Sequence, residues 1–265
     1  MGIIRLRPAH RARHASRGVS LVAVLGLALA AATPAWADGT VSGSAFALSI
    51  DATVAGIHVT VSPTPTLTLP ATGGNLNQSV VSICAGVACS VLSAGILNAA
   101  TQGSTSGSPT SASSASVATV NVLAGVLTAD AIASKCTADS SGVSGSATVT
   151  NAKLAGIAIA VNPGPNTTLS VAGLATVILN ERTTSSSNGT NAITVNAVHV
   201  KLNLGLATGD IIVGQSHCDA TAGTVVPVGT IGVLGLTGLA GIGFAFMQHR
   251  GYRRRLAAAA SQSAL

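Results

Sequence analysis

The chain has 265 residues, and its formal net charge of +6 comes from its two ends, because five arginines precede residue 18 and four follow residue 249. Between residues 38 and 224, four basic side chains stand against seven acidic ones, which excludes the basic surface that nucleic-acid binding requires. Phe46 is the only aromatic residue in that region, so its core must be built from Val, Ile, Leu and Ala.

Residues 1–37 are predicted to be a secretory signal peptide. A basic stretch runs to Arg17, an apolar run covers Gly18–Ala32, and Ala35-Trp36-Ala37 supplies small residues before a cleavage site. Cleavage is expected between Ala37 and Asp38. An uncleaved signal anchor is the alternative, although the apolar run is short for a membrane span.

Residues 225–247 are predicted to form a transmembrane helix, because they contain no charged residue. A helix of that length covers about 34 Å, enough for a hydrocarbon core of about 30 Å. The stop-transfer residues that follow are Arg250, Arg253, Arg254 and Arg255. The positive-inside rule then places the basic tail, residues 248–265, in the cytoplasm and residues 38–224 outside. We therefore expect a single-pass protein of the cell membrane.

The exported region is predicted to be all-β. Ile57, Val59 and Val61 alternate with polar residues until Pro63 and Pro65, which are expected to end that strand. A second alternation changes parity near Ala197–Val198, as a β-bulge would make it do. Further strands are expected at about 41–50, 117–127, 143–150, 168–179 and 207–214.

Two stretches, Thr101–Ser116 and Thr183–Asn191, are predicted to be loops because they consist almost entirely of small and hydroxyl-bearing residues with Gly, Pro or Asn. Many short strands with frequent turn signals favour an antiparallel sandwich or barrel. A β-solenoid is the alternative, but no short fixed period supports it.

An internal repeat indicates a duplicated β-unit, with halves at about 40–136 and 144–218. Val54–Pro65 aligns without gaps with Leu154–Pro165 around a shared Ala-Gly-Ile, and Ser-Gly-Ser-Ala occurs upstream in each half. Each half then closes on an Asp, an apolar run and Ser-x-Cys. Chance similarity between two sequences biased toward Ala, Val and Gly is the alternative.

The chain has four cysteines, Cys84, Cys89, Cys136 and Cys218, all in the exported region. An even number in an oxidising compartment predicts two disulfides, for which three connectivities are possible. We favour Cys84–Cys89 as a local loop and Cys136–Cys218 as a link between equivalent ends of the two halves. A four-cysteine zinc site is the alternative, but the paired C-x₂-C spacing is missing.

No catalytic constellation is evident, and the chain is not expected to be an enzyme or to hold a cofactor or metal. Leu69–Gly73 matches the LPxTG sorting motif but lies far from the apolar span, so it is expected to be a strand ending in a turn. His58, His199 and His217 could be ligands or bases, although the first two lie on polar faces of strands where solvated histidines are ordinary. No G-x-S-x-G motif occurs.

Segments including SGSAFALSI, VSPTPTLTLP, SASVATVNVLAGVLTADAIASKC and ITVNAVHVKLNLGLATGDIIVGQSHC together resemble the actinobacterial choice-of-anchor surface proteins, in particular the P-type family. The resemblance covers roughly residues 40–219. It implies an exported domain of unknown activity and supplies no catalytic or binding residues.

These observations predict a membrane-anchored bacterial surface protein with a structural or adhesive role in the envelope. The alternative is a binding module for a cell-wall polymer or a small ligand. The expected partners are the membrane and either cell-wall components or a second copy of the protein.

Overall fold

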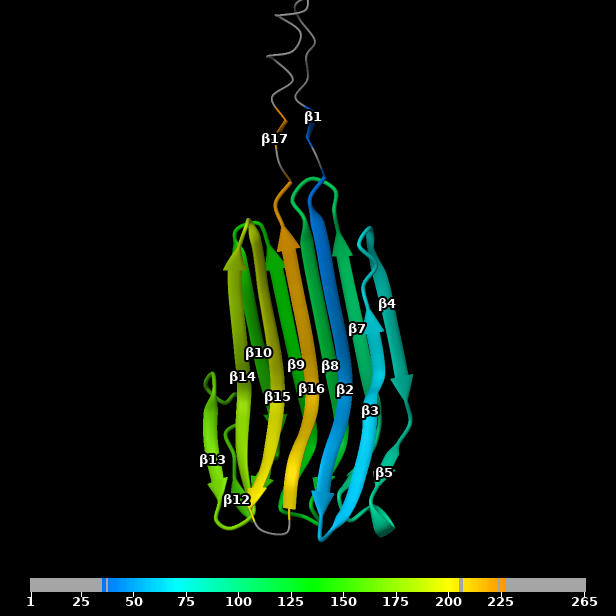
Figure 1. Ribbon diagram of the computed structural model, residues 1–265, viewed down its shortest axis with the longest axis vertical. Helices are drawn as coiled ribbons and strands as arrows, with labels where there is room; N and C mark the ends of the chain where they lie inside the picture. The colour runs from blue at the N-terminus through cyan, green and yellow to red at the C-terminus, as the bar shows by residue number, and fades with distance from the viewer. Residues whose placement is uncertain (1–34, 37, 205–206, 224, 227–265) are drawn as a thin grey trace, which may run out of the picture. The chain divides into compact units, whose positions relative to one another are not determined.

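The computed structural model describes residues 35–36, 38–204, 207–223 and 225–226. Within these ranges the chain forms two antiparallel β-sheets that pack face to face as a sandwich (Figure 1). The predicted all-β antiparallel fold is confirmed, in its sandwich form. In addition, β1 (Ala35–Trp36) and β17 (Val225–Val226) pair in a two-stranded sheet. No helix of these residues has the length and hydropathy needed to cross a membrane.

The first layer is a six-stranded sheet with the strand order β13-β14-β15-β16-β2-β3. Its strands are β13 (Thr167–Val171), β14 (Ala175–Ser187), β15 (Thr190–Leu204), β16 (Ala207–Thr221), β2 (Thr40–Val54) and β3 (Ile57–Thr68). The first long strand and the last therefore lie side by side, with Thr40 opposite Thr221. We call this the terminal end of the sandwich, and the end with the β2–β3 turn the distal end.

The second layer is a nine-stranded sheet with the path β12-β11-β9-β8-β6-β5, to which β10, β7 and β4 add by pairing with β9, β8 and β7 respectively. Its longer strands are β4 (Gly73–Val80), β7 (Leu97–Ser104), β8 (Thr110–Val122), β9 (Leu127–Asp139) and β10 (Gly142–Thr150). Its short strands are β5 (Ile83–Ala85), β6 (Leu92–Ala94), β11 (Lys153–Leu154) and β12 (Ile157–Ala158). The one-turn 3₁₀ helix η1 (Val87–Cys89) links β5 and β6.

β3 continues through Pro63 and Pro65 to Thr68, so the prediction that these prolines end the strand is wrong. β3 is the outermost strand of its sheet, where one side of the backbone has no ladder to join. Proline is tolerated in such a strand because its missing N–H can face outward. The β2–β3 register shifts between Leu48 and Ile50, beside the prolines.

Both predicted loops are largely strand. β7 runs to Ser104 and β8 begins at Thr110, while β14 and β15 are joined only by Asn188 and Gly189. These two residues have φ of 51° and 76°, as in a type I′ hairpin turn. In the first segment the small side chains line the space between the sheets, where Thr101 and Ser113 are buried and hydrogen-bonded to each other at 2.9 Å, whereas the side chains of Thr183–Ser187 are exposed.

The parity change near Ala197–Val198 is confirmed, but the predicted β-bulge is wrong. Four neighbouring strands each bury two consecutive residues at the same level, namely Leu179–Asn180, Ala197–Val198, Val213–Gly214 and Ala47–Leu48. The register between these strands is the same on both sides of that level, so no strand gains a residue over its neighbour. Asn180 and Gly214 take positive φ, at 50° and 70°, and so accommodate the kink.

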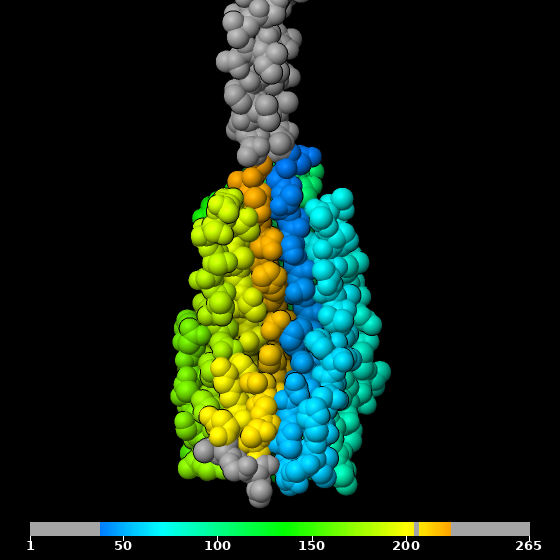
Figure 2. All heavy atoms as spheres, in the orientation of Figure 1, coloured from blue at the N-terminus to red at the C-terminus, as the bar shows by residue number. Residues whose placement is uncertain are grey.

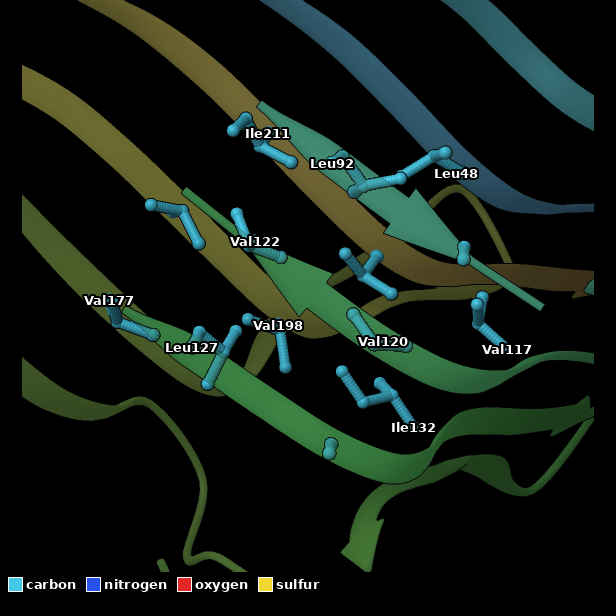
Figure 3. Packing of buried hydrophobic residues seen from close by; sticks show 14 of the residues in the cluster. Leu48, Leu92, Val117, Val120, Val122, Leu127, Ile132, Val177, Val198 and Ile211 are labelled. Carbon is cyan, nitrogen blue, oxygen red and sulfur yellow. The ribbon is translucent and has the colours of Figure 1, made fainter. Parts of the chain in front are cut away.

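Large aliphatic side chains fill the distal half of the core. Leu48 and Ile211 of the six-stranded sheet meet Leu92, Val122 and Ile132 of the nine-stranded sheet there (Figure 3). Each fully buried side chain of this kind contributes roughly 1.5–3 kcal/mol relative to leaving it exposed. This cluster is the main hydrophobic core of the domain.

The terminal half of the core contains many small residues beside Ile193 and Val195, and the two sheets approach closely. A Cβ added to Gly43 would lie 2.7 Å from Thr101 Oγ1 across the sandwich, and one added to Gly145 would lie 2.5 Å from Val195 Cγ2. The Cys136–Cys218 disulfide joins β9 to β16 in this half. With Cys84–Cys89, it confirms the favoured connectivity and leaves no thiolate for the alternative zinc site.

The repeated sequences occupy matching places in the two sheets. Ala55-Gly56 and Ala155-Gly156 both take positive φ and turn the chain directly into Ile57 and Ile157. Each glycine of the repeated Ser-Gly-Ser-Ala lies opposite a disulfide cysteine, Gly43 opposite Cys218 and Gly145 opposite Cys136. A duplicated unit predicts such matches. The halves are interleaved, because β2 of the first half pairs with β16 of the second.

We predict unequal contributions from the two disulfides to stability. Cys136–Cys218 closes a loop with a sequence separation of 82 residues, against 5 for Cys84–Cys89. In the chain-entropy model these loops stabilise by about 4.5 and about 2 kcal/mol. Thermal unfolding of the Cys136→Ala/Cys218→Ala variant should therefore show the larger fall in Tm, and an equal or smaller fall than for Cys84→Ala/Cys89→Ala would contradict this account.

Candidate functional site

An apolar groove of about 540 Å³ opens on one flank of the sandwich, between the β11–β12 hairpin of the nine-stranded sheet and β13 of the six-stranded sheet. Its aliphatic lining residues are Leu154, Ile157, Ile159, Leu169, Val171 and Leu179. The second Ala-Gly turn builds one wall, because it places Ile157 with 74% of its surface exposed. Buried Leu154 and Leu179 close the groove toward the core.

The groove contains no charged side chain. Asn162, Thr167 and Ser170 supply its polar side chains, and backbone at Pro163 and Gly164 borders it. Asn180 fixes this border by donating a hydrogen bond from Nδ2 to the Pro163 carbonyl at 2.8 Å. A concave apolar site with a few polar groups suits an uncharged, largely aliphatic ligand.

A second constellation lies on the outer face of the six-stranded sheet, the face shown in Figure 2. The imidazole of His199 lies between two carboxylates, with Nδ1 2.7 Å from Glu181 Oε2 and Nε2 2.8 Å from Asp210 Oδ1. Asn196 Nδ2 donates to the same Glu181 oxygen at 2.7 Å. The strand register produces this arrangement, because β14, β15 and β16 each contribute outward-facing positions at neighbouring levels.

The pKa of Glu181 is lowered from its usual value. Partial burial raises the pKa of this carboxyl, but hydrogen bonds from Asn196 and His199 and the positive charges of His199 and Lys201 outweigh that effect. Folding therefore favours the ionised form of Glu181. The network ties three strands together on one face.

All three candidate histidines lie on this outer face, and each lies near a carboxylate. His58 Nε2 is 2.9 Å from Asp51 Oδ1 in an exposed pair, and His217 Nε2 is 3.5 Å from Asp219 Oδ2. Sequence reasoning found the histidines but missed their partners, which lie 7, 11 and 18 residues away for Asp51, Asp210 and Glu181. Only strand pairing brings these positions together, although the alternation already placed His58 and His199 on polar faces.

The carboxylates and imidazoles bond to one another and do not converge on a common point. Among the described residues, no group of three or more His, Cys, Asp or Glu side chains could hold a metal ion. This network can bear charge and order the sheet.

The LPxTG-like segment is a turn, as predicted. Leu69 is buried, its N–H donates to the Gly43 carbonyl at 2.7 Å, and Gly73 N–H closes the turn on the Pro70 carbonyl at 2.8 Å. This segment passes from β3 in one sheet to β4 in the other.

Several predicted features fall largely outside the described residues. They are the signal peptide with Ala37 of its cleavage site, residues 227–247 of the membrane helix, and the tail with Arg250, Arg253, Arg254 and Arg255. Asp38 is described and exposed. Val225 and Val226, placed at the start of the helix, form β17.

No family model, curated protein or solved structure matches the chain. Membership of the choice-of-anchor family therefore remains a prediction.

The lowered pKa of Glu181 predicts a pH-dependent contribution to stability. Its carboxylate stabilises the fold fully above the unfolded-state pKa, near the ordinary 4.5, and this stabilisation is lost as the pH falls through the lower folded-state pKa. The fall in Tm caused by Glu181→Gln should be largest near neutral pH and should shrink in acid. A fall in Tm of the same size across that range would contradict this assignment.

Proposed function

We propose that the protein is a membrane-anchored cell-surface protein of bacteria whose exported β-sandwich has a structural or adhesive role in the envelope. The observation that carries this proposal is the pairing of β2 with β16, which brings both ends of the sandwich out at its terminal end. An anchor following residue 224 would then hold the domain by that end alone.

The long strands support a role in display. β2 and β16 each have 15 residues and span about 50 Å at about 3.3 Å per residue. The distal end would therefore stand well away from the anchored end. The Cys136–Cys218 disulfide joins the sheets in the terminal half.

The distal end carries exposed aliphatic side chains suited to adhesion. Ile57, Val87 and Ile157 have 54%, 75% and 74% of their surface exposed. Two of them follow the repeated Ala-Gly turns, and Val87 lies in η1, which joins β5 and β6 beside the same end (Figure 1). Apolar contact with a partner surface would remove these side chains from water.

Display and adhesion can be tested together in intact cells. A cysteine at exposed Thr60 should react with a membrane-impermeant maleimide, whereas one at Ser261 in the tail should react only after lysis. The Ile57→Ser/Val87→Ser/Ile157→Ser variant should be displayed normally but lose attachment to apolar surfaces. Ile96→Ser is the matched control, since Ile96 is also 54% exposed but lies directly before β7.

Labelling of Ser261→Cys in intact cells would refute the proposed topology. Attachment that is the same for the triple variant and the Ile96→Ser control would refute adhesion through the distal end.

The uncharged groove favours a second candidate function, a binding module for a small apolar ligand or an apolar part of a wall polymer. Its volume of about 540 Å³ lies within the range of ligand pockets. This candidate requires only the exported sandwich.

Nile red, a neutral apolar dye, is a suitable probe for the groove. Its fluorescence should rise saturably with the protein, and Ala158→Trp should weaken binding because Ala158 lines the groove with an exposed side chain that can be enlarged without disturbing the core. Thr60→Trp, on the exposed face of β3, is the control. Non-saturating fluorescence, or equal binding by both variants, would exclude the groove as the binding site.

A further inference from the structure

The flank that contains the groove leaves a strand edge bare in its terminal half. β13 pairs only with Ala175–Leu179 of β14, and Asn166 then caps the ladder by bonding to Asn180 O and, through Oδ1, to Arg182 N. Among the described residues, no strand pairs with the outer edge of Thr183–Ser187. Figure 1 shows β13 beside only the distal part of β14.

On the opposite flank, an edge strand covers each sheet in the terminal half as well. There, β3 follows β2 up to the Ser44–Thr68 pair, and β4 covers β7 from Val80 to Gly73. On the bare flank the repeated segment leaves its strand early, since Val161 O accepts a hydrogen bond from Val149 N of β10 and the chain then crosses to the other sheet as β13.

On the flank that contains the groove, both sheets have an unpaired strand edge at the same level. The edge of β10 has no strand beside it over Gly142–Ala147 among the described residues. Asn191, which lies opposite Ser186, donates to the carbonyls of Asp139 and Ser140 at the end of β9. The two open edges therefore lie at the same height.

The main-chain groups on the β14 edge are available in a defined pattern. Arg182 N–H points outward, because it bonds to Asn166 on that side. Alternation along an antiparallel strand then directs the N–H and C=O groups of Thr184 and Ser186 outward, and those of Ser185 toward β15. The edge offers a donor and an acceptor at each of two positions.

This edge lacks the protection that natural edge strands carry. β3, the other edge of the same sheet, contains two prolines, whereas Thr183–Ser187 contains neither proline nor a charged residue. Proline and lysine are common devices against edge-to-edge pairing. Without charge, two identical edges can also approach without repulsion.

We propose that Thr183–Ser187 of β14 pairs antiparallel with the same segment of a second copy of this chain, about a two-fold axis perpendicular to the sheet. Thr184 then exchanges main-chain hydrogen bonds with Ser186 of the second copy, and Ser185 lies opposite itself as a non-hydrogen-bonded pair. The two six-stranded sheets become one continuous sheet. This inference goes beyond the proposed function and does not depend on the anchor.

Cysteine cross-linking of the full-length chain in its native membranes tests the register directly. All four native cysteines are engaged in disulfides, so an added cysteine is the only free thiol. In a non-hydrogen-bonded pair the Cα atoms are about 4.5 Å apart, within disulfide range. Ser185→Cys should therefore give mainly covalent dimer on mild oxidation, whereas Thr184→Cys, which would face Ser186 of the other copy, should give little.

Two further variants separate pairing from chance collision and from misfolding. Thr60→Cys, on the proline-containing edge strand β3, reports collisional cross-linking and should remain largely monomeric. Thr184→Pro combined with Ser185→Cys removes an outward N–H without breaking the ladder to β15, so it should suppress the dimer while Tm stays near that of Ser185→Cys.

Equal dimer yields from Ser185→Cys and Thr60→Cys would overturn the proposal. So would a cross-linked product whose mass identifies a different polypeptide, because the edge would then serve a partner other than a second copy.

Discussion

The pairing of β2 with β16 is the constraint on which the rest of the structure depends. It places the first long strand beside the last inside the six-stranded sheet, where β16 pairs with β2 from Thr40 to Val54 apart from the central kink, and β3 pairs with the other side of β2 from Ser44 onward. It also interleaves the two repeated halves, since neither sheet is made from one half alone. Both ends of the sandwich therefore leave from one end, which is the geometric basis for proposing display from an anchor.

Close approach of the two sheets explains the unusual composition of the chain. The terminal half of the core contains Gly43, Gly145, Ser134 and Ser216, and a Cβ at either glycine would collide with the opposite sheet. Ser134 and Ser216 are the serines of the two Ser-x-Cys motifs, and both are buried beside the disulfide that joins the layers. Small hydroxyl-bearing residues, which usually indicate loops, here allow the sheets to approach closely, while the larger aliphatic cluster fills the distal half of the core.

The two flanks differ because the repeated segment ends differently in the two halves. In the first half the chain continues past Pro63 and Pro65 as a full-length edge strand, and in the second it turns away after Val161. That departure creates the apolar groove beside β13 and leaves the outer edge of Thr183–Ser187 uncovered. The proposed ligand site and the proposed self-pairing edge thus both arise from the same local divergence, at different heights of one flank.

The sequence by itself determined the all-β class, the parity change at Ala197–Val198 and a favoured disulfide connectivity, because side-chain alternation and cysteine position within a repeat are local or pairwise signals. Only the tertiary structure decided that Thr110–Ser116 and Thr183–Ser187 are strands. Small residues favour a strand in the first segment because the second sheet packs closely against it, and in the second because β15 pairs with it. The Glu181–His199–Asp210 network could not be predicted from the sequence either. Its members come from three strands, and a single sequence contains no information on which strands lie side by side.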